Sequence, residues 1–165
     1  MTRLATGDER PAEADAATVE ALQAATRVLA GVALRSLDVL DGSVSLPQFR
    51  VLAVLADLGR ARSGRLARAL GLKASTVTRL ADRLVASGHV TRGSDPRHRG
   101  VVTLAVTREG RDLVDQVQKW RHGELSRILG NLAPADRQAA TRTLRQLVAA
   151  AGEGYGPVRH HLVLL

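Results

Sequence analysis

The sequence predicts a mainly helical protein with a small β-hairpin, in which long helices at both ends of the chain flank a compact basic centre. Apolar residues recur at helical spacing over most of the 165 residues. Two short helical segments meet at Gly71, and a stretch with alternating apolar residues follows them. The net charge of +8 lies entirely in that centre, because residues 60–100 hold ten Lys and Arg against two Asp.

Composition narrows the classes of protein to which the chain can belong. With 45% hydrophobic and 24% charged residues, it is typical of a soluble globular protein with a real core. Only Phe49, Trp120 and Tyr155 are aromatic, so Leu, Val and Ala must fill the core, and an aromatic platform for single-stranded nucleic acid is missing. The lack of cysteine excludes disulfides, thiolate metal sites and thiol-based redox sensing.

The N-terminal part predicts an arm followed by one long helix. Residues 1–15 are polar and mixed in charge, so we expect a disordered arm there. We also expect a cytoplasmic protein without a membrane span, because the chain has no apolar leader and no apolar stretch of about 18 residues. From Ala16 to about Leu40, apolar residues lie near helical spacing, which predicts a long helix that Gly31 weakens.

Capping and turn residues mark three shorter helices in the centre of the chain. Ser45 begins a helix that ends at Gly59. Ser63 can cap the next helix, and Gly71 then supplies a tight turn before a further helix from about Ala74 to Ser87. Two short helices joined through a glycine turn are typical of a helix-turn-helix.

A β-hairpin and two long helices are expected in the rest of the chain. The strands fall at 89–92 and 101–106, around a basic tip at 93–100. Thr107 can cap a helix of about 25 residues, whose apolar stripe is too long for a compact monomer. That stripe contains Leu113, Val117, Trp120, Leu125, Ile128 and Leu132. Pro134 begins a last helix that ends near Gly152.

The concentrated charge points to nucleic acid, because a basic segment on a neutral body can dock a polyanion in one orientation. In a helix-turn-helix, the N-terminal residues of the second helix reach base edges in the major groove. The residues expected to do so here are Lys73, Ser75, Thr76, Thr78 and Arg79. The alternative is a solvated helix face, on which Ser and Thr act only as caps.

Other basic residues suit the DNA backbone or the minor groove. We also expect Arg65, on the first of the two short helices, and Arg83, further along the second, to contact DNA. Arg97 and Arg99 lie at the hairpin tip, from which they could enter a minor groove. Some of the arginines near Arg65 are expected on phosphates, and one or two would instead pair with Asp57 or Asp82.

A series of short motifs occurs in a fixed order along the chain. They are LPQFRVL at 46–52, LARALG at 66–71, STVTRL at 75–80, LVASG at 84–88, DP at 95–96 and TREG at 107–110. Over residues 17–151, this series resembles the MarR family of bacterial transcription regulators. The resemblance implies a winged helix-turn-helix in a homodimer, with the first helix and the last two interlocking across a two-fold axis. It also implies palindromic double-stranded DNA as the target.

The resemblance further implies a division of the chain and a regulated function. We expect a repressor that a small aromatic or phenolic ligand releases from DNA by binding between the dimerisation helices and the DNA-binding lobe. Phe49, Arg50 and Trp120 could line such a cleft, although core or surface positions suit them better.

The wing differs from the family pattern at two positions. His98 and Gly100 stand where many members have an Asp and an Arg, and in those members the Arg enters the minor groove. Here Arg97 or Arg99 would take that role. The expected parts are the arm at 1–15, a dimerisation helix at 16–43, the winged helix-turn-helix at 44–107, C-terminal dimerisation helices at 108–152 and a tail at 153–165.

Other functions compete with this interpretation of the sequence. A sequence-tolerant architectural DNA protein would also need a basic patch and a wing. A large affinity ratio between chosen and random DNA would distinguish a sequence-specific regulator from such a protein. A winged helix used for protein contacts would not bind DNA at physiological salt. No Walker loop, dinucleotide fingerprint or HExxH motif occurs, so we expect neither an enzyme nor a cofactor. The adjacent His160 and His161 suit a tail better than a metal site.

Overall fold

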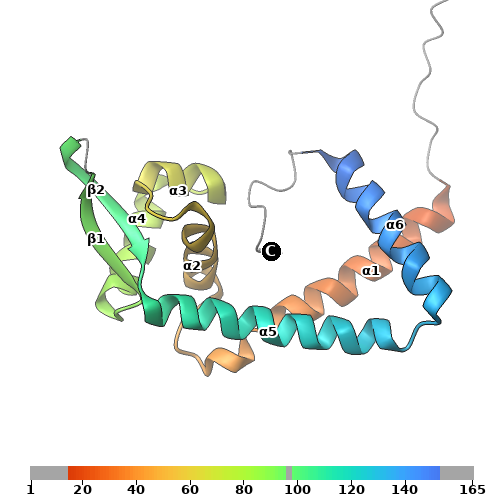
Figure 1. Cartoon of the computed structure of the whole chain (residues 1–165). Helices are drawn as coiled ribbons and strands as arrows, with labels where there is room; N and C mark the ends of the chain where they lie inside the picture. Colours follow the sequence, from red (N-terminus) through yellow and green to blue (C-terminus); the bar gives the residue numbers. More distant parts are fainter. Residues whose placement is uncertain (1–14, 96–97, 153–165) are drawn as a thin grey trace, which may run out of the picture.

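A computed structural model describes residues 15–95 and 98–152 as a small lobe joined to long helices (Figure 1). The lobe contains α2 (Leu46–Leu58), α3 (Ser63–Leu70), α4 (Ala74–Ala86) and the strands β1 (Val90–Asp95) and β2 (His98–Val106). Outside it lie α1 (Ala16–Arg35), the short 3₁₀ helix η1 (Asp38–Leu40), α5 (Arg108–Gly130) and α6 (Pro134–Ala151). The fold class predicted from the sequence is confirmed.

The first helix is shorter than the sequence predicts. It begins at its cap Asp15, whose carboxylate accepts the backbone N–H of Thr18 at 2.8 Å, and it runs unbroken past Gly31. It ends at Arg35 rather than near Leu40, because the Ser36 hydroxyl donates to the Ala33 carbonyl at 2.6 Å and the chain tightens into η1. The expected arm before Asp15 and the tail at 153–165 lie outside the described residues.

The short central helices begin and end close to the expected positions. At the start of α2, the backbone N–H of Ser45 donates to the Gln48 side chain at 2.9 Å. Gly59 and Gly71 both end helices at a φ of 65°, a conformation that favours glycine. The predicted cap of α3 is off by one residue, since Arg62 holds that position and Ser63 is already helical.

The hairpin is longer than predicted and is anchored at its base. Val90 pairs with Val106 and Ser94 with Val102, so the strands extend into the expected tip. Val102 is 58% exposed because it lies out along the wing, beyond the part of the hairpin that covers the core. At the base, Ala61 exchanges two backbone hydrogen bonds with Leu104, at 2.8 and 3.0 Å, and ties the segment before α3 to the wing.

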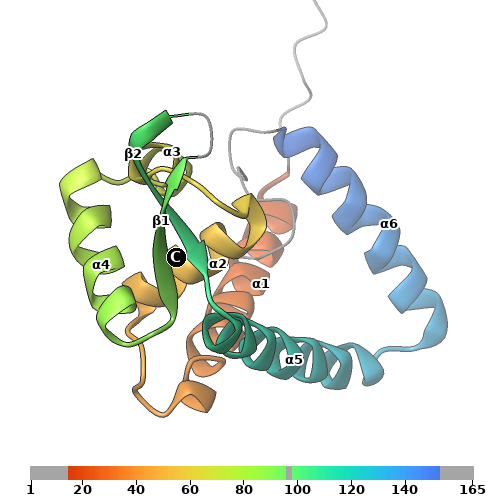
Figure 2. The ribbon, with the colours of Figure 1, turned by 60° about the vertical axis from the view of Figure 1, so that its left-hand side comes forward.

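One apolar core holds the lobe together and extends into α5. Its largest fully buried side chains are Phe49, Leu52, Leu55, Leu66, Leu84 and Leu104. Val114 and Val117 of α5 belong to the same cluster, so the first half of this helix is part of the lobe. Its second half leaves the lobe and leads to α6 (Figure 2).

The helices outside the lobe expose an unusual amount of apolar surface. Among its described residues, α6 has no buried side chain. The exposed large apolar residues of these helices, and of the turn that joins α5 to α6, are Val19, Leu22, Val28, Leu29, Leu34, Leu129, Leu132, Leu144, Leu147 and Val148. The apolar stripe predicted for α5 is only partly buried. The buried face of the helix instead contains Val114, Val117 and Arg121, of which only Val117 belongs to the predicted stripe. Burial of an arginine in that row was not expected.

Candidate nucleic-acid interface

Helix α4 has a buried face and an exposed polar face, as its spacing predicts. Val77, Ala81 and Leu84 are at most 1% exposed and fix the helix to the core. The predicted DNA-contacting residues Lys73, Ser75, Thr78, Arg79 and Arg83 are exposed, and Thr76 is half-buried. Of these, Ser75, Arg79 and Arg83 follow one another at four-residue spacing and form one row along the helix, called here the α4 row.

The turn between α3 and α4 is closed by backbone hydrogen bonds. The N–H of Leu72 donates to the Ala67 carbonyl at 3.0 Å, directly after the left-handed Gly71. Leu66 and Leu70 of α3 are buried in the same core as the inner face of α4. The two helices are therefore held as one unit, from which the α4 row faces outward.

Not every predicted hydroxyl is equally placed to contact a base. The Thr78 hydroxyl donates its hydrogen to the Ala74 carbonyl at 3.0 Å. In this arrangement it can only accept a hydrogen bond from a base. Thr76 is only partly accessible. Ser75 and Arg79 are therefore the best placed of the predicted base-contacting side chains.

Arginines on the surrounding elements extend the basic surface. Arg65 lies exposed on α3, as expected of a DNA-contacting residue. Arg60 reaches the base of the wing and donates to the Thr103 hydroxyl at 3.4 Å. It fits there because Gly93 has no side chain, and a Cβ at that position would overlap the Arg60 guanidinium.

The wing contacts α4 through an ion pair that the sequence did not indicate. Asp82 was expected to pair with an arginine near Arg65, but its partner is Arg92 of β1. Both side chains are about half exposed. Arg97 lies outside the described residues, and so does the side chain of Arg99, so their expected minor-groove contacts stay predictions.

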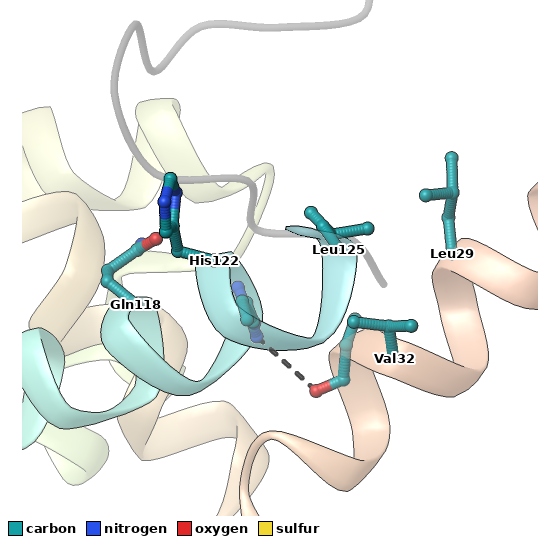
Figure 3. Close-up of a pocket in the computed structure, with 7 residues that line it drawn as sticks. Leu29, Val32, Gln118, His122 and Leu125 are labelled. Atoms are coloured by element: carbon teal, nitrogen blue, oxygen red, sulfur yellow. Dashed lines mark hydrogen bonds between the residues drawn. The ribbon is translucent and has the colours of Figure 1, made fainter. Parts of the chain in front are cut away.

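A cavity of about 170 Å³ lies between α1 and α5 (Figure 3). Leu29, Val32 and Ala33 of α1 line one side of it, and Figure 3 shows Leu29 and Val32 on the helix opposite α5. The α5 side is formed by Gln118, Arg121, His122 and Leu125. Phe49, Arg50 and Trp120, which could have lined a ligand cleft, do not contribute to this cavity.

Arg121 is the most deeply buried charged side chain at this junction, with 7% of its surface exposed. Its Nε donates to the Ser36 hydroxyl at 2.7 Å, and a terminal nitrogen donates to the Ala33 carbonyl at 3.4 Å, the dashed contact in Figure 3. Its guanidinium carbon lies 5.6 Å from the centre of the Phe49 ring. Burial lowers the pKa of Arg121, yet an arginine stays charged in a protein. This one side chain thus joins α1, α2 and α5.

Comparisons with known proteins match the chain to one family. The model of the MarR family matches residues 43–99, which include the helix-turn-helix and most of the wing. An uncharacterised HTH-type transcriptional regulator of Bacillus subtilis, YfiV, is 31% identical over 107 residues, covering 65% of this chain and 67% of YfiV. The chain belongs to the MarR family.

Solved structures agree with this assignment. Rv1404 from Mycobacterium tuberculosis is 34% identical, with a TM-score of 0.79 over 87% of this chain and 99% of Rv1404. A MarR family protein from Bacillus stearothermophilus is 26% identical, with a TM-score of 0.73 over 84% of this chain and 99% of that protein. The chain is therefore a DNA-binding transcriptional regulator with the winged helix-turn-helix of MarR proteins.

Two features are absent from the described part of this MarR protein. None of its helices is long and apolar enough to cross a membrane. Within 15–95 and 98–152, no group of three His, Cys, Asp or Glu side chains could hold a metal ion. The adjacent His160 and His161 lie outside the described residues.

Sequence reasoning missed Arg121, the residue that connects the two parts of this MarR protein. Its position four residues after Val117 places it on the buried face of α5, and that spacing was the available signal. The signal is weak, because arginine at such a position usually extends to solvent.

Proposed function

We propose that this MarR-family protein is a sequence-specific homodimer that represses transcription from a palindromic operator and leaves it when a small molecule binds. The observation that carries the proposal is the α4 row, an exposed Ser and two Arg on a helix that the core holds rigidly. In this proposal, residues 44–107 bind DNA, and the helices at 16–43 and 108–152 form the dimer.

Each part of the basic surface has its own role in this proposal. Ser75, Thr76, Thr78 and Arg79 contact base edges, with Arg79 giving a bidentate contact to guanine. Lys73 was expected at base edges, but it is the N-cap residue of α4 and lies outside the α4 row, so we assign it to a phosphate. Together with Arg65 and Arg83, it fixes the register of the protein on the duplex. The wing arginines Arg97 and Arg99 add contacts in the neighbouring minor groove.

Dimerisation is supported by the exposed apolar residues of α1, α5 and α6. A helix such as α6, which buries none of its described side chains within one chain, gains little from folding by itself. Burying a Leu or Val side chain stabilises by about 1.5–3 kcal/mol, so a second copy that covers Leu144, Leu147 and their neighbours supplies the missing energy. Two copies related by a two-fold axis also match a palindromic target.

Release by a small molecule is supported by the cavity between α1 and α5. It lies where the helices proposed to form the dimer meet the lobe, close to Arg121 and Phe49. A small aromatic or phenolic compound, as the family resemblance implies, would enter beside Leu29 and Val32.

The test compares variants on a duplex recovered from randomised DNA and on a scrambled duplex of equal length. Arg79→Ala should weaken binding to the recovered duplex by about 1–3 kcal/mol, or roughly 5- to 150-fold, and change scrambled binding much less. Lys73→Ala should weaken both duplexes alike and reduce the salt slope by about one. Arg127→Ala is the matched control, because it removes an exposed arginine that pairs with Glu124 on α5.

The same measurements separate the competing functions. Equal loss on both duplexes from Arg79→Ala, with no preference in the parent protein, would favour a sequence-tolerant architectural protein. No binding to either duplex at physiological salt would contradict a regulator that acts through α4.

A further inference from the structure

We propose that Arg60 is a positioning residue for DNA binding, which holds the wing at a fixed angle to α4 and thereby decides which base pairs the wing can reach. The inference rests on the proposed function, because it concerns the part of the wing in reading DNA. It also gives Arg60 a role different from the phosphate contacts expected of the arginines in this segment.

Arg60 lies across the face of the wing that points away from the core. Neighbouring residues of a strand point to opposite faces of a sheet. Leu104 is 1% exposed and belongs to the core, so Thr103 and its cross-strand partner Gly93 lie on the other face. Thr103 is nevertheless only 4% exposed. The Arg60 guanidinium, 3.4 Å from the Thr103 hydroxyl, supplies part of its cover.

A chain of hydrogen bonds joins Arg60 to both strands. Arg60 donates to the Thr103 hydroxyl of β2, which itself donates to the Gly93 carbonyl of β1 at 3.1 Å. The backbone of the next residue, Ala61, is bonded to Leu104 in both directions. A side chain anchored in this way at its own backbone, and in contact with both strands, opposes rotation of the hairpin about its base.

The opposite face of the wing is held less firmly. Its contact with α4 is the pair of Arg92 with Asp82, and both side chains are about half exposed. An ion pair so exposed to water holds two elements together only weakly. Loss of the Arg60 contact should therefore free the outer part of the wing, while its base stays in place through Leu104 and Val106 in the core.

Gly93 offers a way to displace Arg60 without removing its charge. A Cβ at Gly93 would overlap Nη1, at the far end of the flexible Arg60 side chain. The nearest atom outside Arg60 is Thr103 Oγ1 at 3.7 Å, an ordinary contact. Gly93 lies in β1 and does not have a positive φ, so alanine suits its backbone. Gly93→Ala should therefore push the guanidinium aside rather than unfold the lobe.

The first experiment measures hydrogen exchange of the β1 and β2 backbone amides by NMR, on the full chain without DNA. Arg60→Ala and Gly93→Ala should each speed exchange in the outer part of the wing by about 3- to 10-fold. Adding Gly93→Ala to Arg60→Ala should change the rates by less than about twofold, because the new methyl group then has no guanidinium to displace.

Arg68→Ala is the matched control for this experiment. Arg68 is an exposed arginine of α3 that donates to the Gly64 carbonyl of its own helix at 3.4 Å, so exchange in the wing should stay unchanged. Unchanged exchange in both Arg60→Ala and Gly93→Ala would overturn the proposal, and so would effects of the two substitutions that simply add.

The second experiment repeats the selection of randomised duplex DNA with each variant. Arg60→Ala and Gly93→Ala should both bind the duplex recovered by the parent about 3- to 10-fold more weakly. Base preference should flatten at the outer positions, which the wing reaches, and should persist where Arg79 makes its contact. A residue that merely stabilises the lobe would lower the melting temperature and leave every preference intact, which would contradict a positioning role.

A direct phosphate contact by Arg60 would give a different pattern. Arg60→Ala would then weaken recovered and scrambled duplexes alike and reduce the salt slope by about one. Gly93→Ala, which keeps the charge, would bind like the parent, and this combination would overturn the proposal. Failure of the proposed function would appear instead in the parent, as the absence of any recovered sequence, and it would remove the role in reading DNA whatever the exchange rates are.

Discussion

Gly110 offers a sharp test of how α5 is joined to the DNA-binding lobe. A Cβ at this position would overlap the His89 carbonyl oxygen and lie 2.8 Å from Val106 Cγ1. The segment cannot move away easily, because the Thr107 hydroxyl donates to the Gly88 carbonyl at 2.8 Å and the Thr107 N–H donates to His89 at 3.0 Å. Gly110→Ala therefore forces a methyl group against the His89 backbone at the base of the wing.

The magnitude follows from two opposing terms. Overpacking costs about 1–3 kcal/mol, and a backbone clash belongs at the upper end of that range. Alanine recovers about 1 kcal/mol of helix propensity relative to glycine. The net loss of about 2 kcal/mol should lower the melting temperature by roughly 4–8 °C, measured by calorimetry at one fixed protein concentration.

Gly123 of the same helix is the matched control. A Cβ there would meet nothing within 4 Å, so Gly123→Ala should raise the melting temperature by about 2–4 °C. The two substitutions thus have opposite expected signs. If Gly110→Ala were as stable as Gly123→Ala, the close approach of α5 to the turn before β1 would be refuted.

Three further predictions concern the dimer and the helix ends. Leu147→Glu should yield a monomer by light scattering, because it places a charge in the proposed interface, and Val102→Glu on the wing should remain dimeric. The pKa of Asp15 is lowered, mainly by the hydrogen bond from the Thr18 hydroxyl and next by the one from the Thr18 N–H. The Asp15 carboxylate therefore stabilises α1 above the usual titration range of aspartate, and this stabilisation is lost as the pH falls through the lowered pKa. An NMR titration of the Asp15 carboxyl should show that lowered value, and an ordinary one would contradict the cap. Ser45→Ala should cost about 1 kcal/mol in denaturant unfolding, because its hydroxyl also donates to Gln48, at 2.8 Å.

Local chemistry was enough to predict most of the lobe. Gly59 and Gly71 end helices where a positive φ is needed, and Thr107 caps α5 through its own hydroxyl at 3.1 Å from the Gly110 N–H. The two faces of α4 follow directly from the spacing of Val77 and its buried neighbours. In each case, the deciding interaction spans only a few residues.

The features that the sequence did not predict depend on distant partners. The first helix ends early, where the Ser36 hydroxyl donates to the Ala33 carbonyl. The same hydroxyl accepts a hydrogen bond from Arg121, which lies 85 residues further along the chain. Helical spacing continues through Leu37 and Leu40 because both still pack toward the core, so periodicity alone could not show the break. The pairing of Asp82 with Arg92 likewise depends on how the wing folds against α4.

Selection of randomised duplex DNA by the purified protein tests the central claim most directly. The recovered site would then be compared with a scrambled duplex at two salt concentrations. We predict a palindrome with half-sites about one helical turn apart, preferred by roughly a thousandfold or more. Tight binding with no enriched sequence would contradict specific recognition by α4, and no binding at all would contradict the DNA-binding role of the basic surface.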